Sequence, residues 1–234
     1  MAGFKMHIGT STTLGVAYAG AAAWFFDVPP ATCALAGGLC SVSGMLPDLD
    51  SDSGVPLRES IAFAAAVVPM LMIDRFQLMG LSMQSIALAG GAIYLFIRFG
   101  LATALKKYTV HRGMFHSLPA ALIAAEAAFL ICATEDLAMR YFTAGGVLLG
   151  FLSHLVLDEI WSVGFKRGRV YLKSSSGTAL KLWGDNLWAN VSAYAKVAIL
   201  TWLVLQDPVW MNDATPPGEN LRLMAEKLIE RIWK

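Results

Sequence analysis

Residues 142–160 read FTAGGVLLGFLSHLVLDEI, an apolar run that carries a histidine and an aspartate near its end. A helix needs about 20 mostly apolar residues to cross a bilayer, so this run has the length and composition of a membrane span. His154 and Asp158 lie four residues apart, which places both side chains on one side of a helix. The run therefore predicts a membrane helix with a polar site near its carboxyl end.

Further apolar runs surround this one, and the composition agrees with them. They cover residues 8–26, 31–46, 60–76, 85–105, 117–134 and 188–206. Hydrophobic residues make up 56% of the 234-residue chain and charged residues only 15%, whereas soluble domains carry about 25% charged residues. The composition excludes an ordinary cytosolic enzyme and predicts an all-α, polytopic transmembrane bundle of six or seven spans. Small residues let helices approach closely in lipid, so the Gly- and Ala-rich run 8–26 is expected inside the bundle.

The charges of the loops give an orientation. If the amino terminus is cytoplasmic, most loop Lys and Arg residues fall on the cytoplasmic side, and the first three loops on the other side hold only Arg75 and Arg140. This asymmetry follows the positive-inside rule and predicts an integral membrane protein whose amino terminus is cytoplasmic. The formal net charge is +1, and no basic tract favours nucleic-acid binding. The three cysteines do not make a disulfide framework, and buried thiols are expected at Cys33 and Cys40.

The chain divides into three parts. Residues 1–160 are predicted to form a transmembrane metal-site domain, and residues 161–187 a polar cytoplasmic loop with a short strand at 169–173. Residues 188–234 combine a last apolar helix with an amphipathic tail helix over 219–233. That tail is expected on a membrane face, with a solvated or partner-packed tail as the alternative. Lys196 leaves open whether 188–206 spans the membrane or turns back, and hence the side of the tail.

Metal-capable side chains occur in four segments, each at the cytoplasmic end of a predicted span. From the amino end these are His7; Asp48, Asp50 and Asp52; His111 and His116; and His154 with Asp158. In an extended segment, Asp48 and Asp50 would project to the same side, about 6–7 Å apart. Ionisable groups at membrane depth are costly and tend to mark function. The set predicts one or two divalent ions, and mixed imidazole and carboxylate donors suit Zn, Mn or Fe better than Ca.

Residues 111–117, His-Arg-Gly-Met-Phe-His-Ser, predict a turn that leads into a helix. Ser117 is the expected N-cap, with Pro119 in the first helical turn. The exposed amides of such a helix start favour an anion such as phosphate. The turn can therefore present two imidazoles, the Arg112 guanidinium and a hydroxyl group together.

Four of these segments, in this order, resemble a known family over roughly residues 1–160. They are residues 6–9 (MHIG), 44–50 (GMLPDLD), 111–117 (HRGMFHS) and 150–158 (GFLSHLVLD). The set is similar to the membrane-bound, metal-dependent hydrolases, which include the LexA-regulated inner-membrane hydrolases (domain of unknown function 457). The resemblance implies an all-helical fold in the bacterial inner (cytoplasmic) membrane, hydrolytic activity and a bound divalent metal. Its ligands would be His7, Asp48, Asp50, His111, His116, His154 and Asp158. Phe115 and residues 159–162 depart from the family pattern.

These features predict a metal-dependent hydrolase with its site at the cytoplasmic membrane interface. Its substrate is expected to be a phosphoester or a lipid-linked phosphate, with membrane lipids as partners. Arg112 would hold a phosphate or stabilise charge in the transition state. Asp52, Glu159 or an aspartate of the set that does not bind metal would be the general base, and Ser117 would be a hydrogen-bond donor. The alternative is a non-catalytic metal-binding membrane protein or a transporter, although transporters usually place such groups near the bilayer midplane.

Overall fold

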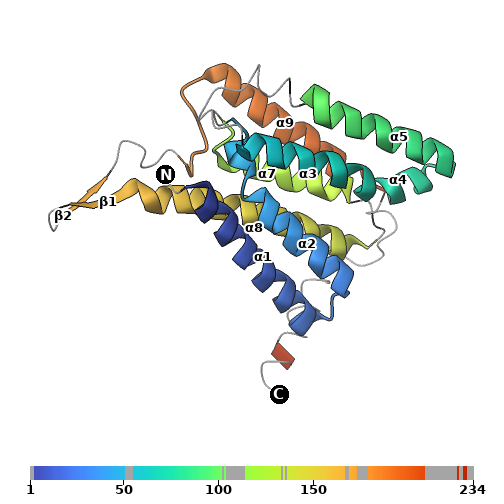
Figure 1. Ribbon diagram of the computed structural model, residues 1–234, viewed down its shortest axis with the longest axis horizontal. Helices are drawn as coiled ribbons and strands as arrows, with labels where there is room; N and C mark the ends of the chain where they lie inside the picture. Colours follow the sequence, from blue (N-terminus) through green and yellow to red (C-terminus); the bar gives the residue numbers. More distant parts are fainter. Residues whose placement is uncertain are drawn as a thin grey trace.

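A computed structural model describes residues 3–50, 55–101, 103, 114–132, 134, 136–166, 169–172, 179–208, 226 and 229–230. These residues form a bundle of helices with one short hairpin (Figure 1), which confirms the all-α class. The helices are α1 Phe4–Phe26, α2 Pro30–Ser43, the 3-10 helix η1 Leu46–Asp50, α3 Val55–Leu71, α4 Ile73–Leu78, α5 Met83–Leu95, the π-helix η2 Phe96–Leu101, α7 Leu118–Ile131, α8 Leu137–Ser162 and α9 Leu187–Leu205. The antiparallel strands β1 Val163–Lys166 and β2 Arg169–Leu172 form the hairpin.

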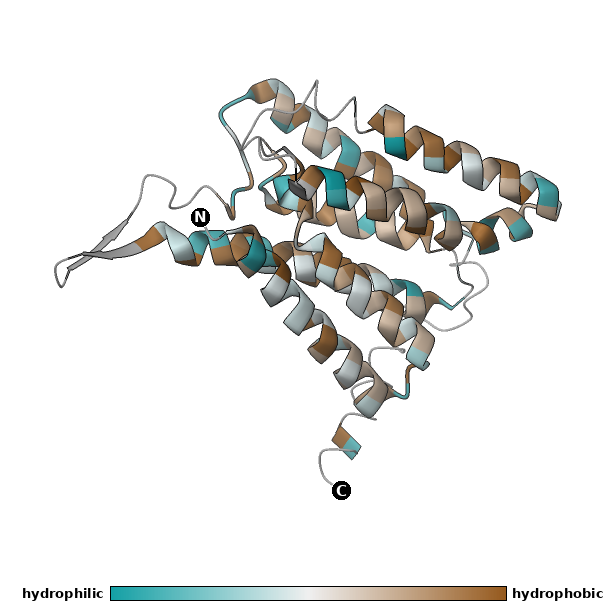
Figure 2. Ribbon diagram, in the orientation of Figure 1, coloured by the Kyte–Doolittle hydropathy of each residue, from teal (hydrophilic) through white to brown (hydrophobic). Residues whose placement is uncertain are grey.

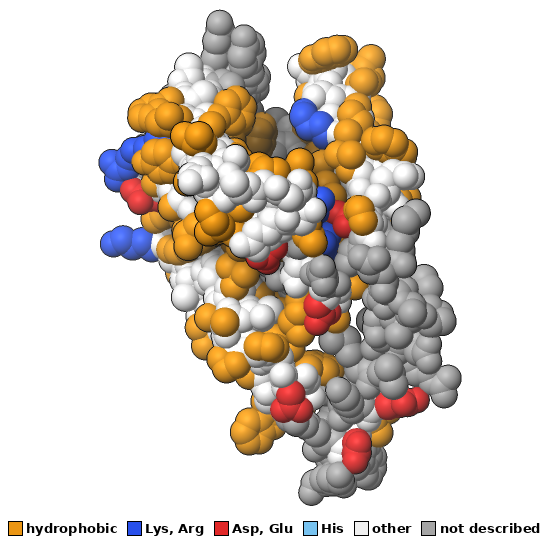
Figure 3. Space-filling view, turned by 90° about the vertical axis from the view of Figure 1, so that its right-hand side faces the viewer, with side chains coloured by type: hydrophobic (Ala, Val, Ile, Leu, Met, Phe, Trp, Pro, Cys, Tyr) orange, Lys and Arg blue, Asp and Glu red, His pale blue; other side chains and the backbone are white. Residues whose placement is uncertain are grey.

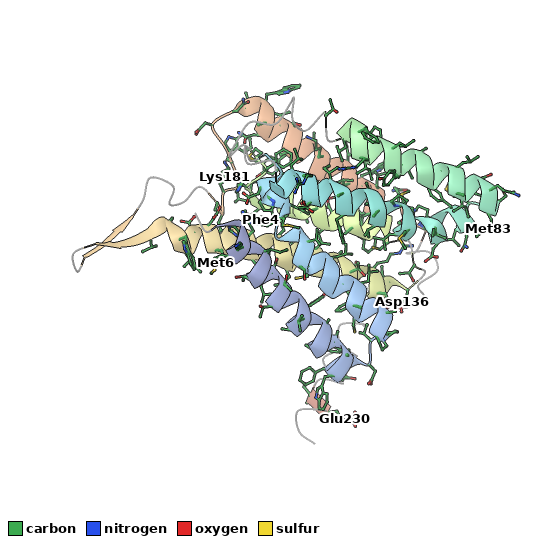
Figure 4. All side chains as sticks on the ribbon, viewed as in Figure 1. Phe4, Met6, Met83, Asp136, Lys181 and Glu230 are labelled. Atoms are coloured by element: carbon green, nitrogen blue, oxygen red, sulfur yellow. The ribbon has the colours of Figure 1, made fainter. Side chains whose placement is uncertain are left out.

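Consecutive long helices run in alternate directions, so their termini gather at two ends of the bundle (Figure 1). We call the end from which β1 and β2 project the hairpin end. The amino end of α1, the carboxyl end of α8 and Lys181 lie there, whereas Met83 and Asp136 mark the opposite end (Figure 4). Motifs far apart in the sequence can therefore meet at one end.

Four helical segments are long and apolar enough to cross a membrane, within the part of the chain that the structure describes. They are Leu57–Leu78, Met83–Leu101, Leu137–Ser162 and Leu187–Leu205. The last of these gives the run 188–206 the length and composition of a span. By contrast, α2 and α7 have 14 residues each, about 21 Å of helix against a hydrocarbon core of about 30 Å. The expected six or seven spans are therefore not confirmed.

The helices α1, α2 and α8 pack against one another through glycine. A Cβ atom on Gly37 would lie 2.8 Å from the carbonyl oxygen of Gly15, and one on Gly146 would lie 2.8 Å from that of Ala36. A Cβ atom on Gly150 would overlap the carbonyl oxygen of Cys40. Glycine thus allows the helix backbones to touch, as small residues do in membrane bundles.

The position of α1 differs from the expectation. Its buried residues form one strip along the helix: His7, Ser11, Gly15 and Ala22. Other positions are open, and the Val16 and Trp24 side chains are exposed. The small residues let α1 lie close to α2 and α8, but they place it at the edge of the bundle and not in its interior.

The outer helices expose apolar side chains. Leu88 on α5 and Trp188 and Trp202 on α9 are all exposed, and both helices are largely apolar along their length (Figure 2). Soluble monomers rarely expose continuous apolar faces of this kind, so the surface suits a membrane. All three cysteines are buried and free, as expected for Cys33 and Cys40.

The segment between α8 and α9 is more ordered than a plain polar loop. The expected strand at 169–173 is confirmed as β2, and it pairs with β1. Helix α8 continues to Ser162, so the expected boundary at residue 160 falls in its last turn. The predicted tail helix 219–233 lies outside the described residues, except that positions 226, 229 and 230 are helical.

Candidate metal centre

Five of the predicted metal ligands meet at the hairpin end of the bundle. Two overlapping groups bring their donor atoms within 4.8 Å of one another: His7, His154 and Asp158 form the first, and Asp48, His116 and His154 the second. They come from the first turns of α1, from η1, from the segment before α7 and from the last turns of α8. We call these five residues the metal-donor cluster.

The donor atoms are spaced as ligands of one ion would be. The Nε2 atom of His7 lies 3.3 Å from Oδ1 of Asp158, and Nε2 of His116 lies 3.4 Å from Oδ1 of Asp48. The Nε2 atom of His154 lies 3.6 Å from Oδ1 of Asp48 and 3.7 Å from Oδ2 of Asp158. Tetrahedral ligands with bonds of about 2.1 Å lie about 3.4 Å apart, whereas N–H···O hydrogen bonds are usually 2.7–3.2 Å. The donor pairs within each of the two groups therefore have the spacing expected for ligands of a common divalent ion.

A backbone carbonyl fixes the orientation of His154. Its Nδ1 donates a hydrogen bond of 2.7 Å to the carbonyl oxygen of Gly44, which leaves Nε2 directed at the cluster. Within the described residues, that Nε2 makes no hydrogen bond. A Cβ atom on Gly44 would overlap Ser11 of α1, so glycine is what lets this carbonyl reach the ring. Such a bond to the second ring nitrogen is typical of histidine ligands.

The cluster opens toward η1. The side chains of His7, His116, His154 and Asp158 are at most 4% exposed, whereas that of Asp48 is 18% exposed. Burial by itself would raise the pKa of the Asp48 carboxyl group, but the neighbouring imidazole groups of His116 and His154 hold that pKa below its ordinary value. Asp48 is therefore a carboxylate at neutral pH, the form that binds metals.

The aspartate motif has a different local structure from the expected one. Residues 46–50 form a 3-10 helix, so the extended geometry predicted for Asp48 and Asp50 is wrong. Pro47 lies within this 3-10 helix. The Leu49 side chain packs against the buried cluster that contains Leu57 and Ile61 of α3. The side chain of Asp50 lies outside the described part of the structure, as do residues 51–54 and 104–113 entirely. The roles assigned to Asp50, Asp52, His111 and Arg112 stay predictions.

Ser117 has a structural part in the site. It is the N-cap of α7, as predicted: its Oγ accepts a hydrogen bond from the Ala120 amide and donates one to the carbonyl oxygen of Met114. The Leu118 amide donates to the Lys181 carbonyl oxygen, and the Ala121 amide to the Ser117 carbonyl oxygen. These bonds occupy the first amides of α7, so the predicted anion site at this helix start is wrong.

Glu159, the other predicted base, follows Asp158 on α8 and is half-buried. Successive residues of an α-helix point about 100° apart. Glu159 therefore does not share the helix side of Asp158 that faces the cluster. Its catalytic role stays a prediction.

A second buried polar cluster lies at the opposite end of the bundle, and the sequence reasoning missed it. Asp207 accepts from Arg75 at 2.7 Å and lies 3.0 Å from Nη1 of Arg140. Arg75 also donates to the Leu130 carbonyl oxygen at 3.0 Å, and Arg140 to that of Thr134. Figure 3 views this end and shows acidic and basic side chains side by side among apolar ones. We call Arg75, Arg140 and Asp207 the arginine cluster.

The fold and the site together define an integral membrane protein with a buried group of metal-capable side chains at one end. Residues 6–169 match the family model of the YdjM inner membrane protein. Because this match covers more than half of the chain, the chain belongs to the YdjM inner membrane protein family, which supports location in an inner membrane. The match includes the whole metal-donor cluster. No curated protein and no solved structure matches the chain.

Proposed function

We propose that the protein is a metal-dependent hydrolase of the inner membrane, with its site at the cytoplasmic interface and a phosphoester or lipid-linked substrate. The observation that carries this proposal is the spacing of the metal-donor cluster, whose donor atoms lie 3.3–3.7 Å apart around His154 and its neighbours. Separate chain segments supply the donors, and an enzyme site is typically assembled from distant segments in this way.

The residues of the metal-donor cluster would hold one or two ions, with Zn, Mn or Fe as the best match to their chemistry. His154 belongs to both groups of donors, and its Nδ1 is bonded to Gly44. A single ion at Nε2 would take its other protein ligands from one of the two groups. A second ion would require further donors, for which Asp50 and His111 are the sequence candidates.

When bound, such an ion supplies Lewis acidity and a source of hydroxide at neutral pH. The chain's own residues would then bind and orient the substrate. Asp48 lies on the more exposed side of the cluster, so substrate and water would approach along η1. Arg112 would hold the phosphate, and Asp52 would accept the proton of the attacking water. We do not include Ser117, because its hydroxyl group is used to cap α7.

The cytoplasmic assignment follows from loop charge. Of the described basic residues, Lys5, Lys166, Arg169 and Lys181 lie at the hairpin end, and segments rich in Lys and Arg stay on the cytoplasmic side. Lipid would cover the exposed apolar faces of α5 and α9. A site at this interface suits a substrate whose phosphate is in water while its apolar part stays in lipid.

One observation favours the alternative of a non-catalytic metal site. Four of the five cluster side chains are almost completely buried, and structural metal sites are usually closed. Transport has less support, because the cluster lies at one end of the bundle and transporters bind near the midplane. A measurement of substrate turnover distinguishes a catalytic metal site from a structural one.

The test is to purify the protein in detergent and measure its metals, together with Asp48→Ala, His154→Ala and the control Asp74→Ala, which changes an exposed residue of α4. We expect about one or two equivalents of Zn, Mn or Fe, lost in the two site variants and retained in the control. Hydrolysis of bis(p-nitrophenyl) phosphate should follow the metal content. Folded protein that takes up no metal would overturn the proposal, and metal binding without turnover of any phosphoester would favour the structural site.

A further inference from the structure

We propose that the exposed side of α9 around Lys196 is an interaction surface for a second membrane protein, one whose own transmembrane helix carries an aspartate or a glutamate at the middle of the bilayer. The Lys196 ammonium group would form an ion pair with that carboxylate inside the membrane. The inference is independent of the metal-donor cluster, because it concerns what the protein assembles with. It follows from the position, the exposure and the contacts of this lysine.

Lys196 lies at the middle of an apolar helix. It is the central residue of the span Leu187–Leu205, which has 19 residues, so it is about 14 Å along the helix from either end. A lysine carries its charge on a stem of only four carbons. Lysines near the ends of a span can place the ammonium group at the membrane surface, but a lysine at this depth cannot.

The rest of the described chain does not cover the side of α9 that carries Lys196. Helix α9 packs against α7, and little of the span is buried. Lys196, Ile199 and Leu203 are exposed, and with Ser192 they follow one another at intervals of three and four residues, which places them on one side of the helix. We call these four residues the lysine face. Without a partner, the lysine face would meet lipid.

The contacts of Lys196 do not satisfy its ammonium group. Within the described residues, Lys196 makes one hydrogen bond, which it donates to the Ser192 hydroxyl oxygen at 2.6 Å. An ammonium group has three N–H donors. The carboxyl group of Glu126 on α7 accepts instead from Thr201 at 2.5 Å. Thr201 lies about 140° around α9 from Lys196, so Glu126 contacts a different side of the helix.

The cost of an unpaired charge explains why a partner is needed. Charged groups at the bilayer centre are rare, and they pair with one another or face the interior of a bundle. Lipid tails offer no hydrogen-bond acceptor. A carboxylate at the same depth would complement the ammonium group in charge, while Ile199 and Leu203 packed against the partner helix. Trp202 lies about 120° around the helix from Lys196, so it would stay in lipid.

The experiment measures association with designed transmembrane helices. The full-length protein, with a fluorescent protein at its amino terminus, is placed in phosphatidylcholine vesicles. Acceptor-labelled peptides of about 20 Leu and Ala residues are added, with glutamate at the centre, leucine at the centre, or glutamate near one end. Energy transfer reports binding to wild type, Lys196→Leu, Lys196→Arg and the control Arg98→Leu, which removes an arginine from the span Met83–Leu101. Leucine suits a side of a helix that faces lipid, so Lys196→Leu should fold.

We expect wild type to bind the peptide with central glutamate about tenfold more tightly than the leucine peptide. Lys196→Leu should abolish this preference, whereas Lys196→Arg and Arg98→Leu should keep it. The peptide with glutamate near one end should show no preference, since its carboxylate lies at another depth. Equal binding of the central-glutamate and leucine peptides by wild type, or a preference that survives in Lys196→Leu, would overturn the inference. Association between two copies of the protein that Lys196→Leu abolishes would also overturn it, because the lysine face would then belong to a homodimer.

Discussion

The two ends of the bundle each bury a polar cluster, but the two clusters differ in charge and spacing. In the arginine cluster, the Asp207 carboxylate lies 2.7 Å from the guanidinium group of Arg75 and 3.0 Å from that of Arg140. In the metal-donor cluster, imidazoles and carboxylates lie 3.3–3.7 Å apart. Both clusters are similarly buried, so burial does not tell them apart. Direct contact between opposite charges indicates a structural link, whereas wider spacing between metal-capable donors indicates a place for an ion.

The arginine cluster should give the largest effect on stability. Arg140→Met would remove one of the guanidinium groups in contact with the buried Asp207 carboxylate and is expected to lower the free energy of unfolding by about 3–5 kcal/mol. Denaturation in detergent measures this change. The control Arg58→Met breaks an ion pair with Glu59 whose arginine side chain is 68% exposed, and it should cost less than about 1 kcal/mol. If both variants lost the same stability, the arginine cluster would not be a structural link.

Metal binding at the metal-donor cluster should stabilise the folded protein, which would distinguish this cluster from the arginine cluster. At a free metal concentration about 100 times Kd, wild-type protein should gain about 2.7 kcal/mol of stability, since only the folded state binds. His154→Ala should gain almost nothing, because it removes a donor shared by both groups. Thermal unfolding with and without metal measures both gains. Arg140→Met is the control and should retain the full gain; an equal gain in His154→Ala would contradict a site at this residue.

A change in the α2–α8 contact tests whether the metal-donor cluster depends on close helix packing. Gly150→Ala would force the new methyl group against the carbonyl oxygen of Cys40 and should cost about 1–3 kcal/mol. It should also weaken metal binding, because Gly150 lies one turn before His154. Gly20→Ala is the matched control, since no heavy atom lies within 4 Å of its added carbon. That control should be neutral or gain up to about 1 kcal/mol from helix propensity.

The smallest effect is expected at Ser117, which lies beside the metal-donor cluster but caps a helix. Ser117→Ala should cost about 1 kcal/mol and leave the bound metal per protein unchanged. Ser82→Ala removes the equivalent cap of α5, where the serine accepts from the Ser85 amide, and serves as the comparison. Metal analysis and thermal unfolding of the two variants give the answer. Loss of metal from Ser117→Ala alone would assign the hydroxyl group to the cluster after all.

The sequence predicted much of the hairpin end, because its signals are local. The i, i+4 pair His154 and Asp158 lies within one apolar run, and His7 and His116 lie at the starts of others. Consecutive spans run in alternate directions, so the end of one span and the start of the next lie at the same end of the bundle. This alternation is enough to predict that these residues meet. The Ser117 cap was predictable for the same reason, since it depends on a few adjacent residues.

The parts that were not predicted depend on contacts between distant segments. Asp207 meets Arg75 across 132 residues, and in the sequence these residues are separate charges at the ends of apolar runs. The bond from His154 to the Gly44 carbonyl oxygen involves a backbone group that no side-chain pattern reveals. The return of Lys181 to Ser117 likewise depends on the tertiary course of the segment after the hairpin.

The glycine contacts among α1, α2 and α8 have a consequence for how sequences of this kind can diverge. Where a Cβ atom would meet a neighbouring backbone, as at Gly37 and Gly146, a mutation cannot be absorbed by a change of rotamer. Exposed positions such as Trp202 of α9 are not limited in this way, because any apolar side chain can face lipid there. Relatives should therefore vary freely along α9 while keeping glycine at the positions of the three-helix contact, even in lineages that have lost the histidines.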